Sequence, residues 1–273
     1  MSEKPDAHTP RFLAWLYSTP AQQPLLGALC GIEREIAASL RAGLDHHVAH
    51  TRLQWWREEC ERCAAGRPSH PLTLELSRRI GASAPGRDAG RALAGLTGLV
   101  ETAAWDLAGA TFEGRQELAD YCRRWAAAML EPLGLARWSE LGTALREIEL
   151  LGDLAREARG GRLRVPLDEL AQAQVPPDAL AAPPWPPTLT ALLHSRHEEL
   201  RRQLRAAVTD LSPQDQHRSR GLLVWTALAW QASERAQRAL PQPPAASIAS
   251  AAAANWRAWR AARAAAAGRF RLG

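Results

Sequence analysis

The sequence predicts an all-α protein in which residues 11–240 fold as a single helical bundle. Alanine, leucine and arginine dominate the composition, and all three favour helix. Apolar residues recur at helical spacing, whereas no stretch alternates β-branched and polar residues as a half-buried strand would. The chain has 273 residues, 46% of them hydrophobic, and one domain of this length can bury a large core.

The helices are expected in a definite order along the chain. Residues 1–10 are polar and contain two prolines, so they are expected to be disordered. Ser18-Thr19-Pro20 ends the first helix, and Ser212-Pro213 has the composition of a helix N-terminus. The predicted helices cover residues 12–17, 23–44, 51–65, 91–107, 145–159, 188–208 and 219–239, and a further helix lies within the stretch 101–130. A glycine-rich loop is expected at 81–90 and an extended proline-rich loop at 176–187.

The last residues, 241–273, are expected to form a proline linker followed by a C-terminal helix rich in alanine. Trp256 and Trp259 fall beside a stripe of arginines in this helix. Such a helix could contact an anionic membrane surface peripherally through residues 255–271. It could also dock on its own domain, and the sequence favours this second arrangement.

Charge and cysteine usage narrow the possible partners and the compartment. The formal net charge is +5, and no block of like charges is long enough to act as a nucleic-acid arm, so nucleic acid is not an expected partner. No apolar run approaches the roughly 20 residues that a membrane span requires. Four cysteines behind a polar N-terminus predict a cytoplasmic protein with free thiols.

Three carboxylates recur every fourth residue in the helix predicted at 145–159. Glu149, Asp153 and Glu157 would therefore stack in one row at the edge of its apolar face. Magnesium commonly binds through one or two carboxylates together with the phosphates of a substrate. With Arg162 close behind, the row could hold a metal-bound diphosphate, and Asp153 and Glu157 are the candidate Mg²⁺ ligands.

The same spacing permits a simpler interpretation. Glu149 and Asp153 face Arg156 and Arg159 at helical spacing, so all four could form ion pairs on a solvated surface. From the spacing alone, this alternative is favoured over a metal site.

The run Asp153–Pro166, DLAREARGGRLRVP, resembles the second aspartate-rich motif of the squalene/phytoene synthase family. Asp153 and Glu157 fall on the first and last acidic positions of that motif, and Gly161-Arg162 falls on its GR pair. The leading arginine of the motif is replaced by Gly152. The resemblance implies an isoprenoid-synthase-like bundle around a central cavity, in which two facing carboxylate rows grip magnesium diphosphates.

Two further blocks resemble the same family. The first is RLQWWR from Arg52, followed by a glycine and by His70-Pro71. The second places Asp106, Tyr121 and Cys122 on family positions in a helix that would line the prenyl tunnel. The resemblance makes Arg52, Asp106 and Tyr121 candidate substrate-binding residues. From the residues alone, Asp106 could equally cap its helix, and Tyr121 is more typical of a core.

The first aspartate-rich motif of the family is missing. The alignment places Arg34 on a conserved arginine, where it would bind phosphate, but puts Ala37, Ala38 and Arg41 on the aspartates. We therefore expect acidic groups on only one wall of the cavity.

These departures predict a catalytically degenerate protein that keeps an isoprenoid- or lipid-binding cavity and acts as an accessory or assembly protein. The sequence is most similar to the branch of the family that includes respiratory complex I assembly factors. The alternative is an active Mg²⁺-dependent enzyme that joins two prenyl diphosphates head to head, in which case Mg²⁺ is the cofactor and a prenyl diphosphate the ligand.

Overall fold

The computed structural model describes residues 4–6, 9–41, 43–83, 87–244 and 248–272. Within these residues the structure is helical and contains no strand, which confirms the all-α prediction. Four short 3₁₀ turns join the α-helices, at Ala38–Leu40, Glu131–Leu133, Ala136–Trp138 and Pro177–Ala181. The α-helices are α1 Pro10–Tyr17, α2 Gln22–Ala37, α3 His46–Ala64, α4 Pro71–Ser83, α5 Arg87–Ala94, α6 Thr97–Leu107, α7 Arg115–Leu130, α8 Ser139–Gly152, α9 Leu154–Arg159, α10 Leu167–Gln172, α11 Pro187–Thr209, α12 Pro213–Arg218, α13 Arg220–Ala239 and α14 Ile248–Ala266.

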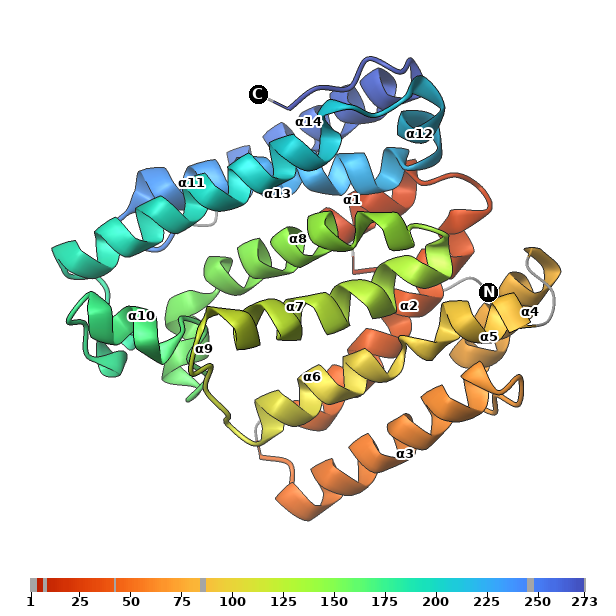
Figure 1. Ribbon diagram of the computed structural model, residues 1–273, viewed down its shortest axis with the longest axis horizontal. Helices are drawn as coiled ribbons and strands as arrows, with labels where there is room; N and C mark the ends of the chain where they lie inside the picture. The colour runs from red at the N-terminus through yellow and green to blue at the C-terminus, as the bar shows by residue number, and fades with distance from the viewer. Residues whose placement is uncertain (1–3, 7–8, 42, 84–86, 245–247, 273) are drawn as a thin grey trace.

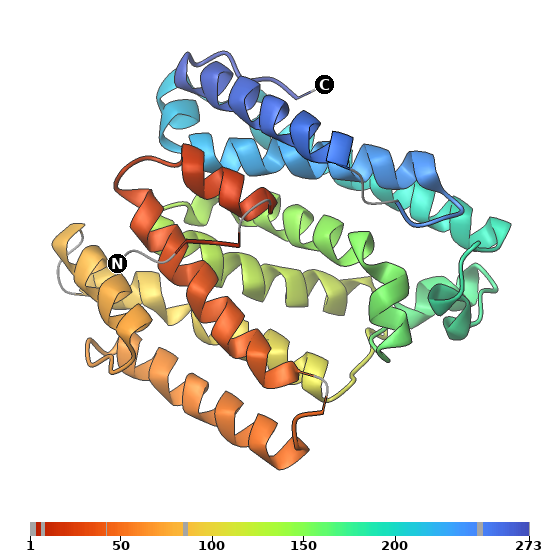
Figure 2. The same cartoon turned by 180° about the vertical axis from the view of Figure 1, so that it is seen from behind.

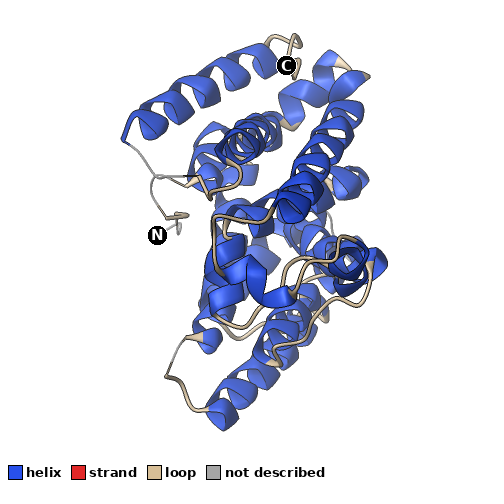
Figure 3. Ribbon diagram, turned by 90° about the vertical axis from the view of Figure 1, so that its left-hand side faces the viewer, coloured by secondary structure: helices blue, strands red, loops and turns tan. Residues whose placement is uncertain are grey.

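The helices pack in successive layers. Helix α3 lies along one edge of the molecule and α14 along the opposite edge, with α7 and α8 between them (Figure 1 and Figure 2). Each of the pairs α3–α6, α6–α7, α7–α8, α8–α13 and α13–α14 is in contact. The side view shows helices throughout, joined by loops (Figure 3). One large apolar core cluster includes residues from all of these layers.

Helix α1 lies unusually close to α13, and this contact positions the start of the chain. A Cβ added at Gly221 would lie 2.7 Å from the carbonyl oxygen of Ala14 and would clash with the Ser18 hydroxyl. The side chain of Thr9 accepts a hydrogen bond from the Phe12 N–H and so caps α1. Arg11 lies two residues after this cap, in the first turn of α1.

Several predicted helix boundaries need correction. The helix expected at 145–159 breaks at Asp153, whose backbone (φ −109°, ψ 12°) ends α8 before α9 begins. The helix expected at 23–44 ends at Ala37 and continues only as a 3₁₀ turn. The helix expected at 91–107 is divided into α5 and α6. Part of the proline-rich loop is a 3₁₀ turn rather than extended chain.

The structure describes parts of both ends of the chain, which were expected to lie outside the helical domain at residues 11–240. Residues 4–6 and 9–10 of the predicted disordered segment have a described structure, and the others lie outside the described residues. Helix α14 packs against α13 and α1, as the docked arrangement of the tail requires. None of the described helices is long and apolar enough to cross a membrane.

Candidate functional site

A cavity of about 750 Å³ lies among α1, α2, α8, α9 and α13, beside the predicted carboxylates. Its volume is typical of a site for a small-molecule ligand. Apolar side chains, among them Leu40, Ile148, Leu150 and Trp225, form part of the wall. The charged lining residues are Asp6, Arg11, Glu33, Arg34, Arg41, Asp106, Arg146, Glu149, Asp153, Arg156, Glu157, Arg162 and Arg164.

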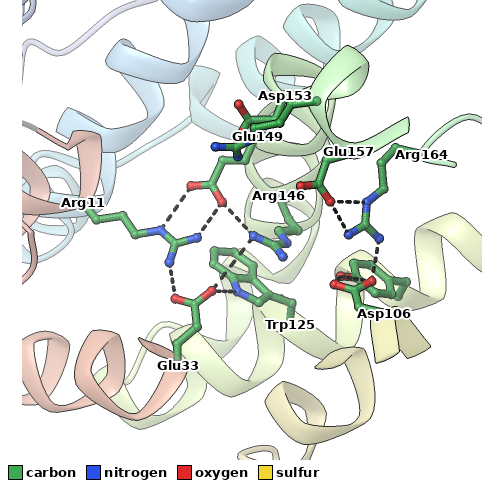
Figure 4. Close-up of polar contacts among 11 residues, drawn as sticks. Arg11, Glu33, Asp106, Trp125, Arg146, Glu149, Asp153, Glu157 and Arg164 are labelled. Atoms are coloured by element: carbon green, nitrogen blue, oxygen red, sulfur yellow. Dashed lines mark hydrogen bonds and ion pairs between the residues drawn. The ribbon is translucent and has the colours of Figure 1, made fainter. Parts of the chain in front are cut away.

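Arg11, which lines the cavity, bridges carboxylates from two different helices (Figure 4). Its guanidinium donates to Glu149 on α8, with Nη2–Oε2 at 2.6 Å and Nε–Oε1 at 3.3 Å. The same group also donates to Glu33 on α2. A guanidinium has five donors in a rigid plane, so one arginine can satisfy two carboxylates at once. Arg11 therefore supplies the positive charge that holds these two walls together.

A second arginine and a tryptophan complete this cluster. Arg146 Nη1 lies 3.2 Å from Glu149 Oε2 and 4.0 Å from Glu33 Oε1. The Trp125 indole N–H donates to Glu33 at 2.8 Å, and its ring lies 5.0 Å from the Arg11 guanidinium and 5.1 Å from that of Arg146. Two glutamates and two arginines therefore form a charge-balanced group, which we call the Arg11 cluster.

A similar arrangement occupies the neighbouring wall. Arg164, only 3% exposed, donates to Asp106 on α6 at 2.7 Å and to Glu157 on α9 at 2.8 Å (Figure 4). The Tyr121 hydroxyl donates to Asp106 at 3.1 Å, and Arg162 donates to Glu157 at 2.8 Å. Gly161 has a φ of +80°, a left-handed conformation that glycine adopts without strain, and it turns the chain between α9 and these arginines.

The arginines keep the buried carboxylates ionised. Burial alone would raise the pKa of Glu157, but hydrogen bonds from Arg162 and Arg164 outweigh burial and lower that pKa to about 2. Burial likewise opposes ionisation of Glu149, and the charges of Arg11 and Arg146 lower its pKa below the usual range. Both groups are therefore anionic at neutral pH, with their oxygens already occupied by guanidinium groups.

The three carboxylates predicted to form one row are separated in the structure. Glu149 belongs to the Arg11 cluster, and Glu157 pairs with the arginines after α9. Asp153 lies at the break between the helices with its side chain 52% exposed, and it pairs with Arg156 at 2.5 Å. The helix break explains the difference, because residues on either side of it no longer share one helical face.

The expectation of acidic groups on a single wall is wrong. Glu33 lines the cavity from α2 and faces Glu149 on α8 through Arg11. The sequence contains a signal for this position. Glu33 precedes Ala37 by one helical turn, so the two residues share one face of the helix. Ala37 and Arg41 also line the cavity, at two of the three positions where the family carries aspartates.

The remaining candidate residues differ in their positions. Arg34 lines the cavity, with its Nη1 3.5 Å from Asp6, and Arg162 lines it beside Glu157. Arg52 lies on α3, outside the lining of the cavity. The Tyr121 hydroxyl contacts Asp106 from behind, and no residue of α7 is among the residues that line this cavity, so the expected tunnel along α7 stays a prediction. The Trp125 ring of α7 lies against the guanidinium groups of Arg11 and Arg146, which do line the cavity.

The most important residue that sequence reasoning missed is Arg11. Nothing local marks it, because it lies in a short helix 22 residues before Glu33 and 138 before Glu149. Arg146 was equally missed, although its spacing of three from Glu149 on a helix is a signal for an ion pair.

The carboxylates of the cavity do not form a set of magnesium ligands. Within the described residues, no group of three or more acidic, histidine or cysteine side chains is arranged to hold a metal ion. The carboxylates that line the cavity instead accept hydrogen bonds or ion pairs from arginines. The side chains in this arrangement do not fit a magnesium site, because each would first have to release an arginine.

The chain is similar to known proteins in both sequence and structure. Residues 5–260 match the family model for squalene/phytoene synthase. A phytoene synthase from Rhodobacter capsulatus is 32% identical over 98 residues, which cover 32% of this chain and only 29% of that relative.

Two solved structures share the fold. A dehydrosqualene synthase in complex with ligand superposes with a TM-score of 0.76 at 14% identity, over 93% of this chain and 92% of the other. The squalene synthase HpnC from Alicyclobacillus acidocaldarius superposes with a TM-score of 0.66 at 18% identity, over 83% and 87%. At these identities the similarity establishes the isoprenoid-synthase architecture and nothing finer.

Proposed function

We propose that this chain, which belongs to the squalene/phytoene synthase family, is a catalytically degenerate member. It binds an isoprenoid or another lipid-like ligand in its cavity and acts as an accessory protein. The observation that carries the proposal is Arg11, whose guanidinium occupies the space between the two acidic walls.

The charge of the cavity supports this assignment. Its lining contains seven arginines and six carboxylates, so it carries no excess of negative charge that would attract a divalent cation. A cation entering the Arg11 cluster would be repelled by two partly buried guanidinium groups a few ångströms away. An anionic head group, by contrast, would be attracted by the arginines that line the cavity, and none of them would have to move away first.

The apolar part of the lining supports a lipid-like ligand. Trp225, Ala229 and Leu150 offer an apolar surface beside the charged residues, as an amphipathic ligand requires. The solved dehydrosqualene synthase was obtained in complex with a ligand, and its architecture is shared here.

One observation favours the alternative, an active Mg²⁺-dependent head-to-head prenyl transferase. Glu33 and Glu149 approach the same point of the cavity from two helices, as carboxylates that share a metal would. In that case Arg11 would have to move away before a metal diphosphate could bind.

Two measurements on the full chain test the proposal. The first is binding of farnesyl and geranylgeranyl diphosphates by calorimetry in a chelating buffer, where we expect binding without divalent metal. The second is incubation of the same compounds with Mg²⁺, where we expect no release of diphosphate and no condensed product. Turnover that Asp153→Asn abolishes and Arg123→Gln leaves intact would overturn the proposal in favour of the transferase.

A further inference from the structure

The net positive charge of the whole chain comes from its last 33 residues. Residues 241–273 hold five of the 34 basic residues and none of the 29 acidic ones. Residues 1–240 therefore contain 29 basic and 29 acidic residues and carry no net charge. So uneven a distribution indicates an anionic partner for the tail rather than for the whole surface.

Helix α14 has one buried face and one exposed face. Among the side chains of α14 that the structure describes, the buried ones are the alanines Ala258, Ala261, Ala262 and Ala265, and the helix packs towards α13 and α1. Its outer face carries four large side chains at spacings of three and four residues: Trp256, Trp259, Arg260 and Arg263. Small residues on the inner face bring the helix close to the domain, so the large residues must point away from it.

On the outer face of α14, tryptophan rings and arginine guanidinium groups contact one another and form a surface that we call the platform. Trp256 is 59% exposed and Trp259 is 37% exposed, and their rings stack with centroids 4.8 Å apart. The Arg263 guanidinium lies 4.8 Å from the Trp259 centroid. These side chains and Arg269 line a shallow open groove of about 660 Å³.

The end of the helix is anchored, which keeps the platform turned outward. Phe270 is buried, and its backbone N–H donates to Gln216 Oε1 on α12 at 2.7 Å. Helix α14 also forms an outer edge of the molecule, with α13 beneath it (Figure 1 and Figure 2). Within the described part of the chain, no carboxylate forms an ion pair with Arg260 or Arg263.

We propose that this outer face of α14 docks the protein on the surface of an anionic lipid bilayer. Tryptophan favours the head-group level of a membrane, where its ring is apolar and its N–H is hydrated. Arginines in the same plane reach the phosphates of anionic lipids. The inference does not depend on the proposed function of the cavity.

A nucleic acid is the competing anionic partner. Single strands are commonly bound by stacking bases on exposed aromatic rings. Here Trp256 and Trp259 stack on each other and the Arg263 guanidinium lies over Trp259, so a base cannot stack on the faces that these contacts occupy. The geometry therefore favours lipid.

Flotation of the full chain with vesicles tests the proposal. We compare phosphatidylcholine alone with phosphatidylcholine containing phosphatidylserine, at low and at high salt. The expected result is binding that requires phosphatidylserine and weakens with salt. R260Q/R263Q should weaken this binding on the order of 30-fold, since each arginine near such a surface contributes about one kcal/mol. W256Q/W259Q should weaken it as well, with the arginines intact.

The matched control is R123Q/R202Q. It removes the same charge from two exposed arginines on α7 and α11, each paired with a carboxylate of its own helix. Equal affinity of R260Q/R263Q and this control would overturn the proposal, as would equal binding to vesicles without phosphatidylserine. Tighter binding to a single-stranded RNA than to anionic vesicles, lost in R260Q/R263Q, would assign the surface to nucleic acid and overturn it too.

Discussion

Arg11 donates to Glu149 at 2.6 Å across 138 positions of sequence, and this contact joins the first helix of the chain to α8. The same guanidinium reaches Glu33, so three helices depend on one side chain. Buried ion pairs contribute little net stability, but removing one partner is costly because the other charge is left buried and unpaired. The Arg11 cluster is therefore a sensitive place to test the structure.

Arg11→Gln should destabilise the fold by about 3–5 kcal/mol, since Glu33 and Glu149 would then repel each other at partly buried positions. Thermal or urea unfolding measures the change, and Arg123→Gln is the surface control, with an expected change within about 0.5 kcal/mol. In Arg11→Gln, added Mg²⁺ should recover part of the loss, whereas it should leave the native protein unchanged. A variant as stable as the native chain would contradict the bridging role.

Arg164 and Arg162 offer a matched pair, because both donate to Glu157. Arg164 is 3% exposed and also holds Asp106, whereas Arg162 is 30% exposed and pairs with Glu157. We expect Arg164→Gln to lower the free energy of unfolding by about 3 kcal/mol or more, and Arg162→Gln by about 1 kcal/mol. Urea denaturation of both variants measures these changes. Equal losses in the free energy of unfolding would show that burial does not set the strength of these contacts.

Glu59 should make stability depend on acid pH. Its side chain is fully buried and accepts the backbone N–H groups of Ser69 and His70 at 2.8 and 2.9 Å, before the start of α4. Burial by itself would raise the pKa of Glu59, but these hydrogen bonds lower it to about 2, from the ordinary value of 4.5. A lowered pKa stabilises the fold above the unfolded value, so the contribution is complete above pH 4.5 and disappears as the pH falls towards 2.

Glu59→Gln should therefore lower stability at neutral pH by on the order of 3 kcal/mol and flatten the dependence on pH between these limits. Unfolding measured as a function of pH gives both values. Glu58→Gln is the control, since its neighbouring side chain is 49% exposed. A steep acid transition that survives in Glu59→Gln would assign it to other groups.

The cysteines should be unreactive in the folded protein. Cys60 and Cys63 are buried and free, and burial raises the pKa of each thiol to about 12. Cys30, at the edge of the cavity, has a pKa raised to about 12 for the same reason. Since the thiolate is the reactive form, a disulfide reagent at mildly alkaline pH should modify these thiols only after denaturant is added. Rapid modification of the native protein would show that the core opens around α3.

The fold was accessible from the sequence because its signals are local. Apolar periodicity located most helices, and Ser212 caps α12 as its position suggests, with its Oγ accepting the Asp215 N–H at 3.1 Å. Cys60 and Cys63 lie in the apolar core. The break at Asp153 was missed although Gly152 directly precedes it, because the apolar spacing continues across the break from Leu151 to Leu154.

The sequence by itself determined the helical class, the family blocks and the absence of aspartate at Ala37, Ala38 and Arg41. Only the tertiary structure decided which charges meet: Arg11 reaches Glu33 and Glu149, and Arg164 reaches Asp106, across separations of 22 to 138 residues. Helical periodicity tells which residues share a face, but ion pairs between helices depend on how those helices pack. The packing is set by the whole core, and no local pattern encodes it.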